Sequence, residues 1–134
     1  MPAYRAPLRD MRFVFDEVLN AYQALQSLPD QTEFTIDLGE AILEEAAKLA
    51  ENVLAPLNSP GDKEGCAYDS QTRLVKTPAG FANAYKQFAE GGWTALACST
   101  EFGGQGLPHV LNMMVEEMVC SANLALGMYP GLTH

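Results

Sequence analysis

Residues 100–109, TEFGGQGLPH, place three glycines within four positions, and a proline follows two residues after the last glycine. A glycine-rich turn that opens a helix is a common phosphate site, because backbone N–H groups there point at the anion. The spacing does not fit the known motifs: His109 stands where the dinucleotide fingerprint needs its last glycine, and no Gly-Lys-Ser/Thr of a P-loop is present. Glu101 would also repel a phosphate. The glycines are therefore predicted to form a tight turn between packed segments.

Carboxylate, thiol and imidazole side chains could support other chemistry. The pair Glu116-Glu117 suggests a di-iron centre, but the Glu-x-x-His spacing of ferritin-like sites does not occur. Three cysteines without CxxC spacing and two histidines are too few and too scattered for a zinc site, so no metal site is predicted. A Cys–His nucleophile pair stays open, although buried structural cysteines are far commoner. Its candidates are Cys98, Cys120, His109 and His134.

Composition narrows the class of protein. The 134 residues suit one domain with a core, and 48% of them are hydrophobic. Seventeen acidic residues against eight basic ones give a net charge of −9, which argues against a nucleic-acid surface and against anionic lipid. No signal peptide or membrane span is expected. Scattered cysteines are interpreted as reduced, mostly buried thiols, so a cytoplasmic protein is predicted.

Hydrophobic periodicity predicts an all-α fold, a bundle of about four to six helices. The first helix is expected over residues 9–28, with Val18 and Tyr22 on its buried stripe. A second is expected to be capped by Asp37, to bury Leu38, and to end at Pro56. The remaining helices are expected at about 78–90, from residue 108, and over 123–129.

The stretch 57–77 is predicted to be irregular, with Arg73-Leu74-Val75 briefly extended and no strand pair. The helix that follows is expected to begin at Thr77-Pro78, to bury Tyr85, and to end at Gly91-Gly92. Glu44, Glu45, Lys48 and Glu51 are expected to form a solvated face of the second helix. Taken alone, these residues predict a helical domain without a complete active site.

Residues 77–107, followed by PHVLNMMVEEM, resemble the amino-terminal helical domain of acyl-CoA dehydrogenases. The matching features are Gly91-Gly92-Trp93, the loop from Glu101 to Gly106, and Glu116-Glu117 one helix on. The opening PAYRAPLRDMRFVFDEVL resembles a helical extension in a bacterial branch that includes methylthiopropanoyl-CoA dehydrogenases. The expected division is therefore an extension over 1–34 and the family domain over 35–134, truncated at its carboxy-terminal end.

The resemblance implies an FAD-dependent enzyme that removes an α-proton and a β-hydride from an acyl-CoA thioester. In the family the catalytic base and most FAD contacts come from later domains, so no catalytic residue is assigned and the cofactor-binding residues stay unknown. The resemblance places the acyl-pocket wall at Leu126, Tyr129 and Pro130. The alternative for these positions is core packing at Leu126 and a helix-ending turn at Tyr129-Pro130.

The leading hypothesis is therefore a domain that covers one side of the flavin and the acyl chain, is inactive alone and does not retain FAD. The resemblance implies acyl-CoA as substrate, an electron-accepting flavoprotein as partner, and a homo-oligomer. Two alternatives stay open: a self-contained helical interaction module, and an acyl-CoA oxidase or related flavoprotein with the same fold.

Overall fold

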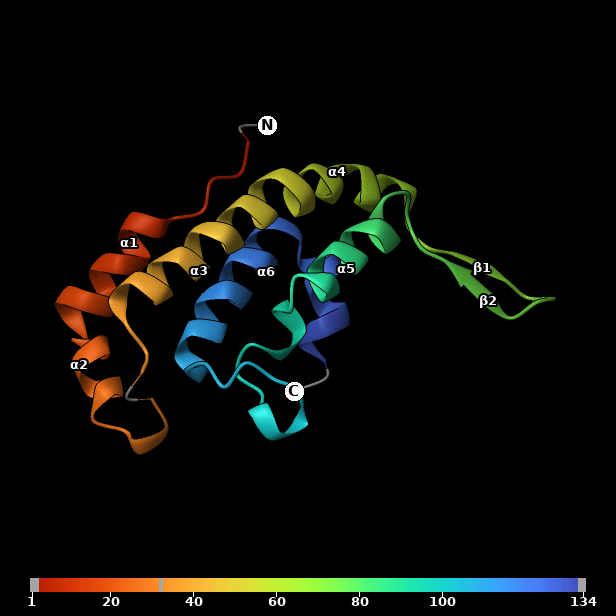
Figure 1. Ribbon diagram of the computed structural model, residues 1–134. Helices are drawn as coiled ribbons and strands as arrows, with labels where there is room; N and C mark the ends of the chain where they lie inside the picture. The colour runs from red at the N-terminus through yellow and green to blue at the C-terminus, as the bar shows by residue number, and fades with distance from the viewer. Residues whose placement is uncertain (1–2, 32, 133–134) are drawn as a thin grey trace.

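The computed structural model describes residues 3–31 and 33–132. It confirms the predicted all-α class, with one small β-hairpin added (Figure 1). The helices are α1 (Leu8–Arg12), α2 (Ala21–Gln26), α3 (Ile36–Leu49), α4 (Ala55–Glu64), α5 (Phe81–Glu90) and α6 (His109–Gly131). The strands are β1 (Ala67–Asp69) and β2 (Leu74–Lys76). Short 3₁₀ turns cover Pro29–Gln31, Trp93–Ala95 and Thr100–Phe102.

A long helical rod formed by α3 and α4 runs along one side of the molecule, with α6 packed against it (Figure 1). The predicted end at Pro56 is wrong, because the chain stays helical to Glu64. A π-helical segment, Ala50–Leu54, joins the two helices just before Pro56, which occupies the first turn of α4. Proline is tolerated at that position because the N–H that it lacks would have no partner in the first turn.

The start and the buried face of α3 also differ from the prediction. The hydroxyl of Thr35 caps the helix by accepting a hydrogen bond from the Leu38 N–H (3.2 Å), so the expected cap, Asp37, lies inside the first turn. Leu38 is 43% exposed. The buried positions of α3 and of the π-helical segment are instead mostly small residues: Gly39, Leu43, Ala46, Ala47, Ala50 and Leu54.

The single amino-terminal helix predicted over residues 9–28 is broken. A π-helical segment, Phe13–Val18, follows α1, and Asn20 then adopts a left-handed conformation (φ 47°) before α2 begins. The wider π turn changes which side chains face inward, so Val18 is exposed while Tyr22 is buried. Tyr22 packs between Phe15 (ring centroids 4.8 Å apart) and Phe34 (5.5 Å).

A two-stranded antiparallel hairpin projects away from the helices beyond the end of α4 (Figure 1). The expectation of no strand pair is therefore wrong. The register pairs Tyr68 with Val75, and Asp69 organises the turn by accepting a hydrogen bond from the Gln71 N–H (2.8 Å). Arg73 has a positive φ of 58°. Only three residues per strand pair up, which is why alternating hydrophobicity did not reveal the hairpin.

Helix α5 ends at Gly91-Gly92 as predicted, but it begins at Phe81 rather than at Pro78. Its buried face is Phe81, Ala84 and Phe88, so the expected burial of Tyr85, which is 40% exposed, is wrong. Helix α6 begins after Pro108 as predicted and contains a kink at the position where a separate helical piece was expected to start. No helix within residues 3–31 and 33–132 is long and apolar enough to cross a membrane.

Candidate functional site

The glycine loop, residues 100–109, is held by hydrogen bonds within the chain. The backbone N–H groups of residues 104–107 donate to carbonyl oxygens of the preceding segment at 2.9–3.0 Å. The acceptors are Ser99 for Gly104, Ala95 for Gln105, Cys98 for Gly106 and Leu96 for Leu107. Because these amides already have acceptors, the loop does not present the free N–H groups that a phosphate cradle requires. This geometry agrees with the tight turn predicted from the sequence.

Two contacts explain the residue types in this loop. A Cβ at Gly104 would lie 2.2 Å from the carbonyl oxygen of Cys98, so the backbones approach too closely for any other residue. The side chain of Gln105 donates from Nε2 to the Gly92 carbonyl (2.9 Å) and thereby ties the loop to the end of α5. The loop is a tightly packed connection between α5 and α6.

The acidic and thiol side chains are the other candidates for chemistry in this chain. Within the described part of the chain, no three His, Cys, Asp or Glu residues are placed to hold a metal ion. Glu116 accepts a hydrogen bond from the Asn112 amide (2.7 Å). The expectation of mostly buried cysteines is wrong, since Cys66, Cys98 and Cys120 are all exposed. Partial burial and then the nearby Glu116 raise the pKa of Cys120, which disfavours the thiolate needed for nucleophilic attack. Of the two histidine candidates, His109 is the first residue of α6, and His134 lies outside the described residues.

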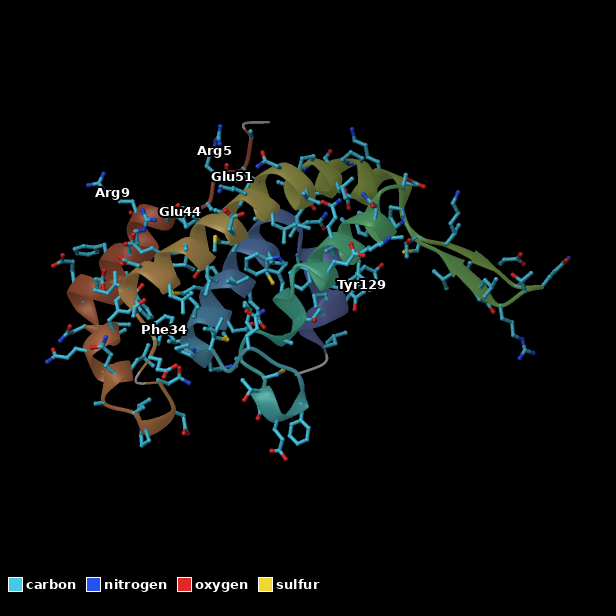
Figure 2. The ribbon with its side chains drawn as sticks, in the orientation of Figure 1. Arg5, Arg9, Phe34, Glu44, Glu51 and Tyr129 are labelled. Carbon is cyan, nitrogen blue, oxygen red and sulfur yellow. The ribbon has the colours of Figure 1, made fainter. Side chains whose placement is uncertain are left out.

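The three positions expected to line the acyl pocket fall on the last turns of α6, and they have different surroundings. Leu126 is fully buried (0% exposed) and belongs to the hydrophobic core. Tyr129 is 43% exposed and lies at the carboxy-terminal end of α6, close to α5 (Figure 2). Pro130 is buried within the helix, one residue before its end at Gly131. Tyr129 thus lies at the surface, Pro130 lines a cavity, and Leu126 lies in the core.

Tyr129 forms one wall of a hollow of about 320 Å³ between α5 and α6. Its ring meets that of Tyr85 edge to face, with the centroids 6.4 Å apart. Phe81, Ala82 and Thr77 complete the lining. The hollow is mainly apolar and aromatic, the character expected of a small-molecule site wall. Burial and then the neighbouring Cys66 raise the pKa of Tyr129, so its phenol remains neutral near pH 7.

Pro130 lines a separate cavity of about 50 Å³ beneath the same end of α6. Phe88 and Trp93 from the α5 side face it, together with Gly127. The position of the final turns of α6 therefore affects both hollows. Sequence reasoning missed Tyr85 and Phe81 as site residues because the periodicity of α5 assigned both to the core. It also missed Asn123, whose polar side chain in an apolar helix was the available indication.

The amino-terminal segment, residues 3–31, is held on the rod by charged groups. Arg5 Nη1 lies 2.6 Å from Glu51 Oε2, and the other oxygen of that carboxylate accepts a hydrogen bond from the Ala6 N–H (3.0 Å; Figure 2). Arg12 Nη2 lies 2.8 Å from Glu44 Oε1. The face predicted to be solvated is thus partly covered, and the side chain of Glu51 is only 19% exposed.

Comparison with known proteins identifies this architecture. The sequence model described as "Acyl-CoA dehydrogenase, N-terminal domain" matches residues 37–134. The match covers the rod, α5, the glycine loop and α6, and it begins after the amino-terminal segment. The chain belongs to the acyl-CoA dehydrogenase family, of which it carries the N-terminal helical domain.

Three curated relatives match almost the whole chain. A 3-methylmercaptopropionyl-CoA dehydrogenase of Ruegeria pomeroyi is 35% identical over 98% of this chain. A broad-specificity linear acyl-CoA dehydrogenase of Mycobacterium tuberculosis is 29% identical over 98% of it, and a butyryl-CoA dehydrogenase of Syntrophomonas wolfei 29% identical over 97%. This chain spans about a fifth of the length of these relatives, 22%, 21% and 21%. The matches include the amino-terminal segment that the family model leaves out.

Proposed function

We propose that this domain forms one wall of the acyl-CoA site in an FAD-dependent dehydrogenase that introduces a double bond between the α and β carbons of an acyl-CoA thioester. The observation that carries the proposal is the match of nearly the whole chain to three relatives, each named as a dehydrogenase of an acyl-CoA. The aromatic hollow beside Tyr129 supplies a matching surface, because an acyl tail needs apolar, water-excluding walls.

The flavin itself is assigned to other parts of the protein. The glycine-loop amides, the most plausible phosphate donors by sequence, already donate to carbonyls of this chain. The described residues therefore fit a wall beside the flavin better than a complete flavin site. FAD, when bound by the longer enzyme, supplies the hydride acceptor, and this domain contributes no catalytic residue to that step.

The role that we assign to Tyr129 is contact with the acyl chain. The phenol of Tyr129 is neutral, and its ring packs edge to face with that of Tyr85. The two side chains therefore present uncharged aromatic rings to the hollow. Leu126 supports that wall from the core, and Pro130 fixes its end. Oxidation of the substrate would require exclusion of water from this region, which an apolar lining promotes.

We place the protein in the cytoplasm, in fatty-acid metabolism, with an electron-accepting flavoprotein as its redox partner. Three free, exposed thiols are in keeping with a reducing compartment. A homo-oligomer is also proposed. It is supported by exposed apolar side chains of the amino-terminal segment, a feature typical of contact surfaces. These are Phe13, Val14, Val18 and Leu19, with exposed fractions of 48–60%.

The test replaces Tyr129 in the FAD-loaded longer enzyme and measures kcat/KM for acyl-CoA substrates of increasing chain length. Tyr129→Ala enlarges the hollow and should change the ratio of kcat/KM between octanoyl-CoA and butyryl-CoA by roughly tenfold, the scale of a few methylene contacts. Tyr129→Phe keeps the ring and should leave the ratio close to wild type. Phe102→Ala, a change to an exposed aromatic residue outside the hollow, is the matched control. An unchanged ratio in Tyr129→Ala would refute the acyl-wall role.

A further inference from the structure

Helix α6 is interrupted by one fully buried asparagine. Asn123 is 0% exposed and has extended rather than helical dihedral angles (φ −160°, ψ 88°) within an otherwise helical run. Its conformation and its side-chain bond are those of a helix N-cap, so the residues from Leu124 onward form a new helical piece. The kink therefore sets the direction of the segment that carries Leu126, Tyr129 and Pro130.

Both functional groups of the Asn123 amide are used. The backbone N–H of Leu126 donates to Oδ1 (3.1 Å), the bond expected of a cap. Nδ2 donates to the backbone carbonyl of Leu54 (3.1 Å), at the end of the π-helical segment of the rod. Leu54 is itself fully buried. One side chain thus starts the last turns of α6 and also ties them to the opposite helix.

Geometry makes this tie important for the hollow. Tyr129 lies six residues beyond Asn123, about 9 Å along a helix at 1.5 Å per residue, so a tilt of roughly 10° at the kink would move it by about 1.6 Å. Displacements of about 1 Å are large for a site that positions a substrate. Tyr129 also contacts Tyr85 on α5, so any tilt changes the spacing of the two rings.

We propose that Asn123 is a positioning residue for the acyl site: its amide, bonded to Leu54 on the rod and to Leu126 on α6, fixes the angle of the final turns and thereby the distance between Tyr129 and Tyr85. Its link to acyl selection rests on the function proposed above. Its link to the ring geometry does not, so the two claims can fail separately.

The test uses NMR of the 134-residue chain without any acyl-CoA. In the wild type, the Tyr85 and Tyr129 rings should show a mutual nuclear Overhauser effect, and the Leu126 amide should exchange slowly. Asn123→Ala should lose the ring contact and speed Leu126 exchange by at least about tenfold, since both bonds disappear. Asn123→Asp keeps the acceptor for Leu126 and loses the donor to Leu54, so it should lose the ring contact while Leu126 stays protected.

Asn112→Ala is the matched control, because Asn112 is also buried on α6 (3% exposed) but bonds to Glu116 upstream of the kink. It should preserve both readouts. A folded Asn123→Ala or Asn123→Asp variant that keeps the ring contact would overturn the proposal. The wild-type chain also tests the bond from Asn123 to Leu54. Asn123 side-chain amide protons that exchange as fast as those of the exposed Asn58 would contradict that bond.

In the FAD-loaded longer enzyme, Asn123→Asp should change the kcat/KM ratio of octanoyl-CoA to butyryl-CoA by at least roughly threefold, with Asn112→Ala unchanged. Moved rings with an unchanged ratio would refute the acyl role of the hollow and would leave the positioning role of Asn123 supported.

Discussion

Glu51 holds Arg5 and the backbone of the next residue at the same time. Its two carboxylate oxygens accept from Arg5 Nη1 (2.6 Å) and from the Ala6 N–H (3.0 Å). The side chain of Arg5 is 81% exposed, so solvent screens much of the ion pair. The bond to the backbone is therefore the more important of the two for docking the amino-terminal segment on the rod.

Replacing Glu51 should separate these contributions. Glu51→Gln keeps an acceptor for the Ala6 N–H and should cost about 0.5 kcal/mol of unfolding free energy, the scale of an exposed pair. Glu51→Ala removes both contacts and should cost about 1–2 kcal/mol. Urea denaturation provides the measurement, with Glu45→Gln, which breaks only the exposed pair with Lys48, as control. Equal losses in the two Glu51 variants would contradict the assignment to the backbone bond.

The same carboxylate should make docking of the segment dependent on pH. The Ala6 N–H and then Arg5 lower the pKa of Glu51 below its ordinary value of 4.5. A lowered folded-state pKa adds stability that is present above pH 4.5 and is lost as the pH falls through the folded value. The protection factors of amides in residues 3–12, which are exchange rates corrected for their intrinsic pH dependence, should fall as the pH drops below 4.5. The fall should be smaller in Glu51→Gln, and the same pH response in that variant would argue against Glu51 as the cause.

The elements that the sequence predicted well are those with long apolar periodicity or glycine punctuation. Helix α6 and the end of α5 at Gly91-Gly92 are examples. The failures have different causes. In the first helix, Met11, Phe15 and Tyr22 are buried as predicted, but the π-helical segment Phe13–Val18 shifts the side-chain phase, so Val18 is exposed. In α3 the buried face consists mostly of small residues, so the larger apolar Leu38 was assigned to it wrongly. Pro56 was predicted to end the helix. A helix tolerates proline in its first turn, but the sequence pattern did not show that a new helix, α4, begins at Ala55.

The candidate site was only partly predictable. The resemblance named Tyr129, which lies at the end of α6, but the hollow also depends on Tyr85, which is contributed by α5 and meets Tyr129 only after α5 and α6 pack together. The role of Asn123 likewise depends on Leu54, 69 residues away along the chain. Contacts of that separation are set by tertiary packing, and local patterns carry no information about them.

Gly104 tests the account of the glycine loop. Gly104→Ala places a Cβ 2.2 Å from the Cys98 carbonyl oxygen, so the backbone must move. The expected loss of unfolding free energy is about 1–3 kcal/mol, the usual cost of overpacking. Thermal and urea denaturation measure it. Gly131→Ala is the control, since no atom lies within 4 Å of its Cβ position, and it should change stability little. A stable Gly104→Ala variant would show that the close approach is not required.

Thiol reactivity tests the exposure and electrostatics of the cysteines. All three should react with a disulfide reagent in the native state, because all three are exposed. Cys120 should react slowest near pH 8, since partial burial and Glu116 raise its pKa and reduce its thiolate fraction. Cysteine-to-serine variants identify each phase. Glu116→Gln should accelerate the slow phase, and an unaffected rate would remove Glu116 as a contributor.

We propose that this domain belongs to a flavin-dependent acyl-CoA dehydrogenase and acts only together with its other domains. The most direct measurement compares the 134-residue chain with the longer protein for bound flavin absorbance and for dye reduction driven by acyl-CoA. We expect a colourless, inactive chain and a yellow longer protein that reduces the dye when butyryl-CoA or another acyl-CoA is added. A chain that purifies with FAD, or a yellow longer protein that oxidises no acyl-CoA, would contradict it.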